Sequence, residues 1–228
     1  MRRVRSGKKR ASPLGVGPPP DLPLKETTFV VVDVETTGMS ASSDRITEIA
    51  MMRVRGGTLI DEFSTLVNPL MTIPAFITDL TGIDNVMVHD APTARDIVPA
   101  MAKFLGDSVF VAHNVGFDWG FVTHTAKRER GIVLQNPLLC TVKLSRRILP
   151  RLKSKSLGPV AEHLDIRIPD RHRASGDAYA TSLVLVKFLS YLARNKSIHT
   201  LDELLRYQHS AVQRALRIRR LSEVRGPG

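Results

Sequence analysis

Thr28-Phe29-Val30-Val31-Val32-Asp33 is an apolar, β-branched run without polar alternation, and it is the first stretch of the chain that predicts ordered structure. Such a run is typical of a strand that is buried on both faces of a sheet. Two further strands are predicted at residues 46–53 and 58–67, and Gly56-Gly57 between them predicts a hairpin turn. The fold therefore begins with three consecutive strands.

Strands and helices alternate along the rest of the chain. The sequence predicts a helix at 93–105, a short buried strand at 108–112, a helix at 117–130, a strand near 138–142, short helices to about 163 and a long helix at 175–194. This order indicates an α/β fold, with a mixed sheet and helices packed on its faces. Residues 200–222 carry an imperfect apolar helical stripe, which would pack on the core or dock a partner; we favour the core.

The net charge of +11 is concentrated at the two ends of the chain. Residues 1–25 hold seven basic residues and one acid, whereas the middle of the chain is nearly balanced. We expect a disordered basic arm rich in Pro and Gly at 1–24, one domain at 25–197 and a basic helical extension at 198–228. A cationic arm can hold nucleic acid, or it can be a solvated tail.

Cellular context is indicated only in outline. The single cysteine, Cys140, excludes an intrachain disulfide and fits a small core residue in a reducing cytoplasm. The apolar run at 178–192 is too short and too polar to span a bilayer, and no apolar segment follows the basic N-terminal residues as in a secretory signal. We therefore expect a cytoplasmic protein without a membrane partner.

Two acids stand at the end of the first strand. Asp33 and Glu35 are two residues apart, so the period of a strand directs both side chains to one face. Carboxylates that close repel each other unless a cation lies between them. Ligation by oxygen alone suits Mg²⁺ or Mn²⁺, which retain water for a phosphate substrate. A charged strand end without a metal is the alternative for this pair taken alone.

Two later segments bring further acids to helix starts. His113-Asn114-Val115-Gly116-Phe117-Asp118 follows the short strand and delivers Asp118 to the first turn of a helix, where an acid can also simply favour the helix dipole. His172 and Asp177 open the last long helix and can reach the same pocket.

Taken together and in this order, Asp-Val-Glu-Thr-Thr-Gly at 33–38, His-Asn-Val-Gly-Phe-Asp at 113–118 and His172 with Asp177 closely resemble the DEDDh exonucleases. This DnaQ-like family includes the proofreading epsilon subunit and the exonuclease domain of bacterial DNA polymerase III. The resemblance covers residues 28–192, and Leu-Thr-Gly-Ile at 80–83 is similar to a family segment near the substrate groove. Arg173, where the tyrosine class of the superfamily has Tyr, favours the histidine class.

The resemblance implies a ribonuclease-H-like fold with a five-stranded mixed sheet and a metal-dependent 3′–5′ exonuclease that releases nucleoside monophosphates. It implies two divalent ions, Mg²⁺ or Mn²⁺, held by Asp33, Glu35, Asp118 and Asp177. His172 would be the general base on the attacking water, and these five residues would be the catalytic set.

Substrate contacts are expected in the loops beside these acids. Backbone N–H groups of the turn after Glu35 would face the terminal nucleotide, and Met39 would wedge between the last bases. Phe117 is a second stacking candidate, with core packing as its alternative. The full set of expected substrate-binding residues is Thr36, Thr37, Gly38, Met39, His113, Asn114 and Phe117.

The expected substrate is the single-stranded 3′ end of DNA, in proofreading or repair. An RNA 3′ exonuclease is the alternative with the same active site, since 2′-OH contacts are not readable from the sequence. A non-catalytic nucleic-acid-binding or polymerase-associated module is the alternative of another class, and it would need a broken ligand set. A polymerase catalytic subunit, if it is a partner, would be a separate chain.

Overall fold

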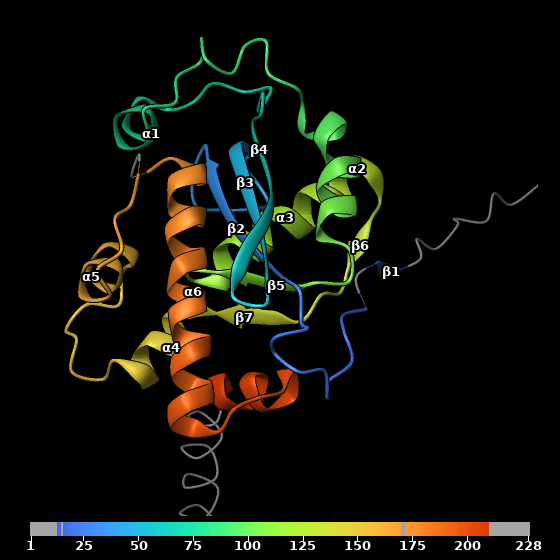
Figure 1. Cartoon of the computed structure of the whole chain (residues 1–228). Coiled ribbons are helices and arrows are strands. Elements are labelled where there is room, and N and C mark those ends of the chain that lie inside the picture. Colours follow the sequence, from blue (N-terminus) through green and yellow to red (C-terminus); the bar gives the residue numbers. More distant parts are fainter. Residues whose placement is uncertain (1–12, 15, 170–171, 210–228) are drawn as a thin grey trace, which may run out of the picture.

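The computed structural model describes residues 13–14, 16–169 and 172–209 of the 228-residue chain. A five-stranded mixed sheet with the strand order β4-β3-β2-β5-β7 forms its centre (Figure 1). The strands are β2 (Phe29–Thr36), β3 (Ile46–Arg55), β4 (Thr58–Leu66), β5 (Val109–Ala112) and β7 (Leu138–Cys140). The first three are antiparallel neighbours, and β5 and β7 continue the sheet in parallel to β2.

The helices lie on both faces of this sheet. One face carries α4 (Thr141–Ile148), α5 (Leu157–His163) and α6 (Ala174–Lys196), and the other carries α2 (Ala94–Leu105) and α3 (Val115–Arg130). A short helix, α1 (Ala75–Thr81), covers a small separate cluster at one end. The α/β fold with a mixed five-stranded sheet flanked by helices is as the sequence predicts.

The central strand β2 divides its side chains between two cores. Phe29 and Val31 belong to the core beneath α6, whereas Val30, Val32 and Val34 belong to the core beneath α2 and α3. This follows from the period of two in a strand, and it explains why the run lacks polar alternation. The face of Phe29 and Val31 is therefore also the face on which residues 33 and 35 follow.

Pairing along β2 is unequal on its two edges. On one edge, β2 pairs with β3 from Phe29 to Thr36, with a bulge between Glu35 and Thr36. On the other edge, the ladder with β5 covers only Phe29 to Val31. Among the described residues, the last part of β2 thus has no strand partner on the side of β5.

Helix starts and ends follow local chemistry. Thr93 and Asp96 form a capping box at the start of α2, with Thr93 N–H donating to the Asp96 carboxylate at 3.0 Å. Gly131 ends α3 in the left-handed region with φ 67°. Small side chains on α6, including Ala174, Ala178 and Ala180, are fully buried and allow close packing of that helix on β2 and β3.

Several predicted boundaries change. The last strand ends at Cys140, because the chain turns directly into α4, and α3 begins at Val115 rather than at residue 117. The sequence analysis missed α1 and a two-stranded sheet of β1 (Pro13–Leu14) and β6 (Val133–Leu134). These elements are too short for a periodic pattern to appear. The buried position of Cys140 in the core is confirmed.

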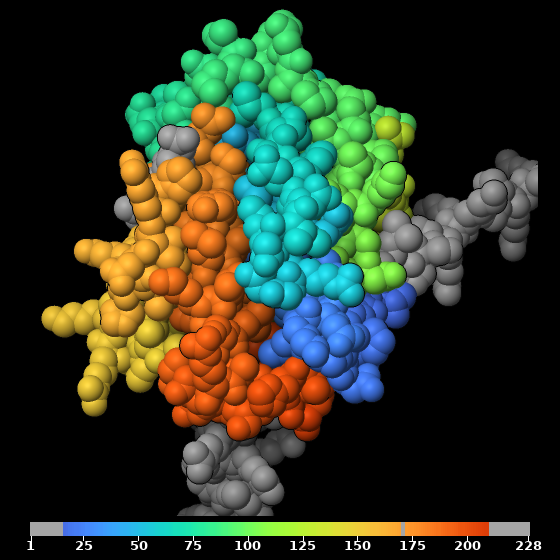
Figure 2. Space-filling model, in the orientation of Figure 1, coloured from blue at the N-terminus to red at the C-terminus, as the bar shows by residue number. Residues whose placement is uncertain are grey.

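The described part of the N-terminal segment is ordered, which contradicts the prediction of a disordered arm for residues 16–24. Leu24 N–H donates to the carbonyl of His199 at 2.8 Å, and Leu201 N–H donates to the carbonyl of Leu22 at 3.1 Å. Figure 2 shows this segment beside residues 201–209 at one end of the molecule. Proline-rich backbone offers few donors, and here its carbonyls accept from the C-terminal segment. Residues 1–12 and 15 lie outside the described residues.

The chain beyond α6 packs on the same end of the domain. Residues 201–209 are helical, and Ile198, Leu201 and Leu204 join the core beneath α6. The core interpretation of this stripe is therefore confirmed as far as residue 209, and residues 210–228 lie outside the description. Within the described residues, none of the helices combines the length and apolar character needed to cross a bilayer.

Candidate metal and active site

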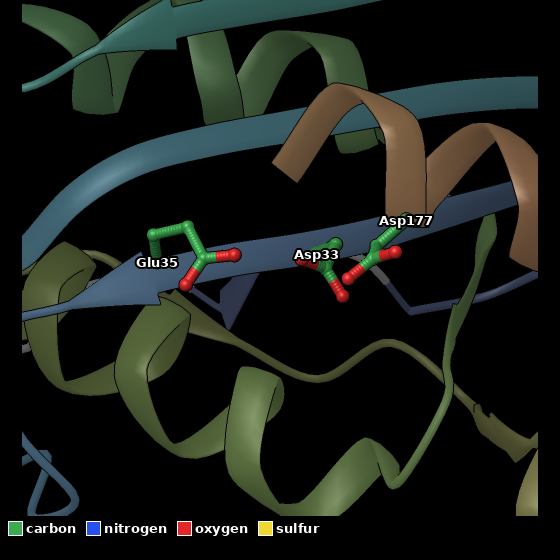
Figure 3. A group of neighbouring side chains, drawn as sticks. All are labelled: Asp33, Glu35 and Asp177. Carbon is green, nitrogen blue, oxygen red and sulfur yellow. The ribbon is translucent and has the colours of Figure 1, made fainter. Parts of the chain in front are cut away.

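Three carboxylates converge at the end of β2. Asp33 and Glu35 project from the β2 face that α6 covers, and Asp177 projects from the first turn of α6 (Figure 3). One oxygen from each lies within 4.8 Å of the others. Asp33 and Glu35 share a face, as predicted from the strand period. The fold adds Asp177, which lies 142 positions after Glu35 in the chain.

Asp118 joins the site on the edge of β2 that faces β5. Its Oδ1 accepts a hydrogen bond from the backbone N–H of Val34 at 3.2 Å, and its side chain is only 4% exposed. Val34 lies beyond the last residue of β2 that pairs with β5, so the carboxylate takes the place of a strand partner. The acid of the α3 first turn thereby comes next to Asp33 although α3 covers the opposite face of the sheet.

This crowding makes ionisation of the carboxyl groups unfavourable. Burial, together with the negative charges of Asp118 and Asp177, raises the pKa of Asp33 well above its ordinary value. Burial and the charge of Asp177 raise the pKa of Glu35 to about 8. Burial also raises the pKa of Asp118 to about 8, against the opposing effect of its backbone hydrogen bonds.

A divalent cation fits this donor set. The four side chains offer only carboxylate oxygens, the ligand type that Mg²⁺ and Mn²⁺ prefer. Clustered acids with raised pKa values are stabilised when a cation supplies the missing positive charge. The cluster of Asp33, Glu35 and Asp177 is thus suited to hold metal, as the sequence predicts; the identity of the ion is a matter of proposal.

Glu48 is a buried acid beside the site that sequence reasoning missed. It lies on β3 directly opposite Glu35 and is 4% exposed. Its carboxylate accepts from Arg173 Nη2 at 2.7 Å, from Arg173 Nε at 3.1 Å and from the backbone N–H of Ala174 at 2.9 Å. It therefore anchors the start of α6, from which Asp177 projects. A charged residue inside the apolar run Ile46–Met52 was the available signal.

His172 lies in the connection immediately before α6. It is exposed, and its backbone has φ 63°, in the left-handed region that few non-glycine residues adopt. The Arg173–Glu48 contact fixes the next residue of the chain. The structure thus places His172 at the surface beside the helix start that carries Asp177, and its catalytic role stays a prediction.

The turn after β2 is internally bonded. Thr36 Oγ1 donates to the Gly38 carbonyl at 2.6 Å, and Thr37 Oγ1 accepts from the backbone N–H of Arg45 at 3.0 Å. Both threonines are buried, whereas Met39 is 81% exposed. Gly38 leaves no room for a side chain, because an added Cβ would lie 2.6 Å from the Asp44 carboxylate. Met39 is thus exposed, as a side chain that inserts between two bases must be.

The predicted substrate residues of the second motif divide into three kinds. For His113, the predicted contact with the substrate is corrected, because both ring nitrogens serve the fold. Its Nδ1 lies 2.8 Å from Thr141 Oγ1, and its Nε2 lies 2.8 Å from the Lys155 carbonyl. Phe117 packs against Phe121 with ring centroids 5.0 Å apart, which supports its alternative role in the core. Asn114 is exposed with φ 82° and precedes α3, so it remains open to a ligand.

Comparisons with known proteins bear on this site. Residues 30–185 match the family model RNase T, described as exonuclease. The chain is 40% identical over 169 residues to the DNA polymerase III subunit epsilon of Aquifex aeolicus, covering 74% of this chain and 84% of that protein. It is 42% identical over 204 residues to a bifunctional exonuclease/endonuclease protein of Mycobacterium tuberculosis, covering 86% of this chain and 32% of that protein.

Longer relatives and solved structures agree. The chain is 40% identical over 176 residues to DNA polymerase III PolC-type of Clostridium perfringens, covering 77% of this chain and 12% of that protein. Exonuclease X in complex with 5′ overhanging duplex DNA superposes with a TM-score of 0.62 at 25% identity, covering 79% of this chain and 99% of that chain. Escherichia coli Exonuclease I in complex with a dT13 oligonucleotide shares the fold, with a TM-score of 0.66 at 17% identity over 75% of this chain and 43% of that one.

Proposed function

We propose that this chain, which belongs to the RNase T exonuclease family, is a metal-dependent 3′–5′ exonuclease. It would remove nucleoside monophosphates from single-stranded 3′ ends of DNA. The predicted resemblance to DnaQ-like exonucleases and the ribonuclease-H-like fold are confirmed by these relatives. The chain spans about a third of the mycobacterial relative (32%) and about an eighth of the PolC-type polymerase (12%). The activities and partners of those whole proteins are therefore part of the proposal.

The observation that carries the proposal is the carboxylate cluster at the end of β2. Three oxygens from Asp33, Glu35 and Asp177 lie within 4.8 Å of one another, and Asp118 is held beside them at Val34 N–H. A non-catalytic module would have no need to hold four acids together at the cost of raised pKa values.

Divalent ions, when bound, would lower the pKa of a water and stabilise the negative charge on the phosphate. Asp33, Glu35 and Asp177 would hold them, and Asp118 would support a second ion from the β5 side. His172 would take the proton of the attacking water, because an imidazole is a suitable base near neutral pH and the residue lies in the connection that leads into α6. Met39 would separate the last bases, since it is exposed directly after the active-site turn.

DNA is the proposed substrate, in proofreading or repair, with a DNA polymerase catalytic subunit as a partner. Support comes from two relatives, named DNA polymerase III subunit epsilon and DNA polymerase III PolC-type, and from two solved structures of exonucleases that hold DNA. RNA remains an outcome of the test. A DNA and an RNA oligonucleotide of one sequence, each labelled at the 5′ end, would be digested with Mn²⁺, and the product ladder would be read over time.

We expect a ladder that shortens from the 3′ end on DNA, with mononucleotides released. Asp33→Ala should remove the activity while leaving the circular dichroism spectrum and unfolding midpoint near or above those of the native chain. Asp107→Ala is the matched control, because it removes an exposed carboxylate just before β5, at the other end of the sheet. Native turnover by Asp33→Ala, or digestion from a 3′-blocked end, would refute the proposal.

A further inference from the structure

Three arginines from separate parts of the chain line a pocket beside the active-site turn. The pocket has a volume of about 380 Å³ and lies between the β2–β3 connection, the β4–α1 connection, the start of α2 and the last turn of α3. Its arginines are Arg45, Arg95 and Arg128. No residue of the metal cluster lines it, so it is distinct from the carboxylate site.

The charge balance of the pocket is positive. Glu129 is the one acid among its described lining residues, and its Oε1 lies 2.8 Å from Arg128 Nε. Arg45 is held in place, because its Nη1 donates to the carbonyls of Ser43 at 2.7 Å and Asp44 at 2.9 Å. Arg95 and Arg128 are exposed. The lining therefore carries a net charge of +2 beside solvent.

Compensation of the dipole of α3 accounts for only part of this arrangement. Basic residues in the last turn of α3, Arg128 among them, are favoured by the negative end of the helix. Arg45 belongs to the connection after β2, and its side chain donates within that connection rather than to that helix end. Arg95 lies in the first turn of α2, where a positive charge is disfavoured, and its Nη1 donates to the carbonyl of Glu129 in the last turn of α3 at 3.5 Å. The end of α3 therefore accounts for Arg128 and in part for Arg95, but not for Arg45.

The pocket adjoins the active-site turn directly. Its lining residues Arg45 and Met71 both contact Thr37, through Arg45 N–H to Thr37 Oγ1 at 3.0 Å and Thr37 Oγ1 to Met71 Sδ at 3.7 Å. Thr37 follows Glu35 by two positions. The arginine pocket is therefore one contact away from the turn that follows the carboxylate cluster.

We propose that this arginine pocket binds a backbone phosphate of the nucleic-acid substrate at a nucleotide remote from the scissile bond. Guanidinium groups present a planar fork of donors that matches phosphate oxygens, and partly exposed arginines retain donors for such a ligand. The inference rests on the proposed function and extends it, since it assigns a second anchoring point for the substrate outside the metal site.

The test compares two double variants of the full chain that remove the same charge. Arg95→Ala with Arg128→Ala removes two pocket arginines, and Arg151→Ala with Arg194→Ala removes two exposed arginines from other faces. Binding of a fluorescent 20-nucleotide single-stranded DNA is measured by anisotropy in EDTA, over a range of salt concentrations. Hydrolysis of the p-nitrophenyl ester of thymidine 5′-monophosphate, which has no remote phosphate, is measured with Mn²⁺.

We expect the pocket variant to bind the oligonucleotide on the order of tenfold more weakly at low salt than the control variant. Its slope of log K against log salt should be shallower by about 0.7, since one lost phosphate contact on a single strand removes about 0.7. Hydrolysis of the ester should be equal in both variants. Arg45 is left intact, because its side chain donates to the carbonyls of Ser43 and Asp44 in the active-site turn.

Equal affinity and equal salt slope in the two variants would overturn the inference. It would also be wrong if a poly-glutamate peptide, and not the oligonucleotide, distinguished the variants, because the pocket would then serve an acidic protein partner. Binding is measured without metal, so a native chain that binds DNA but never hydrolyses it would refute the proposed function and leave this inference standing.

Discussion

Glu48→Ala should separate the anchoring of α6 from the chemistry of the metal ligands. The native carboxylate accepts three hydrogen bonds, two from Arg173 and one from Ala174 N–H. The Glu48 side chain is only 5% exposed. Removing one partner of a buried ion pair costs about 3–5 kcal/mol, mainly because the other charge stays buried. The side chain of Arg173 is 34% exposed and can turn towards water, which favours the lower end.

A second effect acts in the opposite direction. The negative charge of Glu48 contributes to the raised pKa of both Asp33 and Glu35, so its removal relieves part of the repulsion in the cluster. We therefore expect Glu48→Ala to lower the free energy of unfolding by about 2–3 kcal/mol. Urea denaturation in EDTA would measure this value.

Asp61→Ala is the matched control for stability. The Arg53–Asp61 pair bridges β3 and β4 in the same sheet, but 49% of the Asp61 side chain is exposed. An exposed pair contributes about 0.2–1 kcal/mol, so the control should lose much less stability. A loss for Glu48→Ala no larger than that for Asp61→Ala would refute the reasoning.

A metal titration of activity provides the functional half of this test. If Glu48 positions Asp177 through the start of α6, Glu48→Ala should raise the Mn²⁺ concentration needed for half-maximal turnover at a temperature where it is folded. Glu48→Gln, which keeps an acceptor of the same shape, should restore most of the metal affinity. A half-maximal concentration equal to that of the native chain in Glu48→Ala would show that the contact is structural only.

Three other predictions follow from the site and its surroundings. The raised pKa values of Glu35 and Asp118 mean that the metal-free folded state holds protons that the unfolded state releases near pH 4. Stability in EDTA should thus fall as the pH rises from about 4 to about 8. The affinity for Mn²⁺ should rise over the same range. Thermal melts test the first expectation and calorimetry the second, each at several pH values, and a flat profile would contradict them. Gly38→Ala should raise KM for oligonucleotides several-fold, since the new Cβ must displace the Asp44 carboxylate that lies 2.6 Å away; an unchanged KM would show that the turn gives way freely. Gln208→Ala should lower the free energy of unfolding by about 2 kcal/mol in urea denaturation. Gln208 accepts from the N–H of Cys140 and donates to the carbonyl of Leu138 at the sheet edge, and both groups would lose their partner. A loss below about 0.5 kcal/mol would mean that water replaces the side-chain amide.

Local patterns were sufficient for most of the fold. The strand at 28–33, the hairpin at Gly56-Gly57 and the helix at 93–105 were predicted because their periodicity and turn residues reflect short-range geometry. The short helix α1 and the β1–β6 pair carry no such periodicity. The order of residues 16–24 was missed for a related reason, since its hydrogen bonds go to Leu201 and His199 at the other end of the chain.

The amino-acid sequence by itself determined the type of site: the acids of the three motifs, their common order and the shared face of Asp33 and Glu35 all follow from the chain and the strand period. Only the tertiary structure decided how Asp118 enters, because β5 stops pairing with β2 after Val31 and leaves Val34 N–H for the carboxylate. It also decided that His113 serves the fold and that Glu48 holds the start of α6. Hydrogen-bond partners distant in sequence determine such roles, and the pattern of neighbouring residues does not contain them.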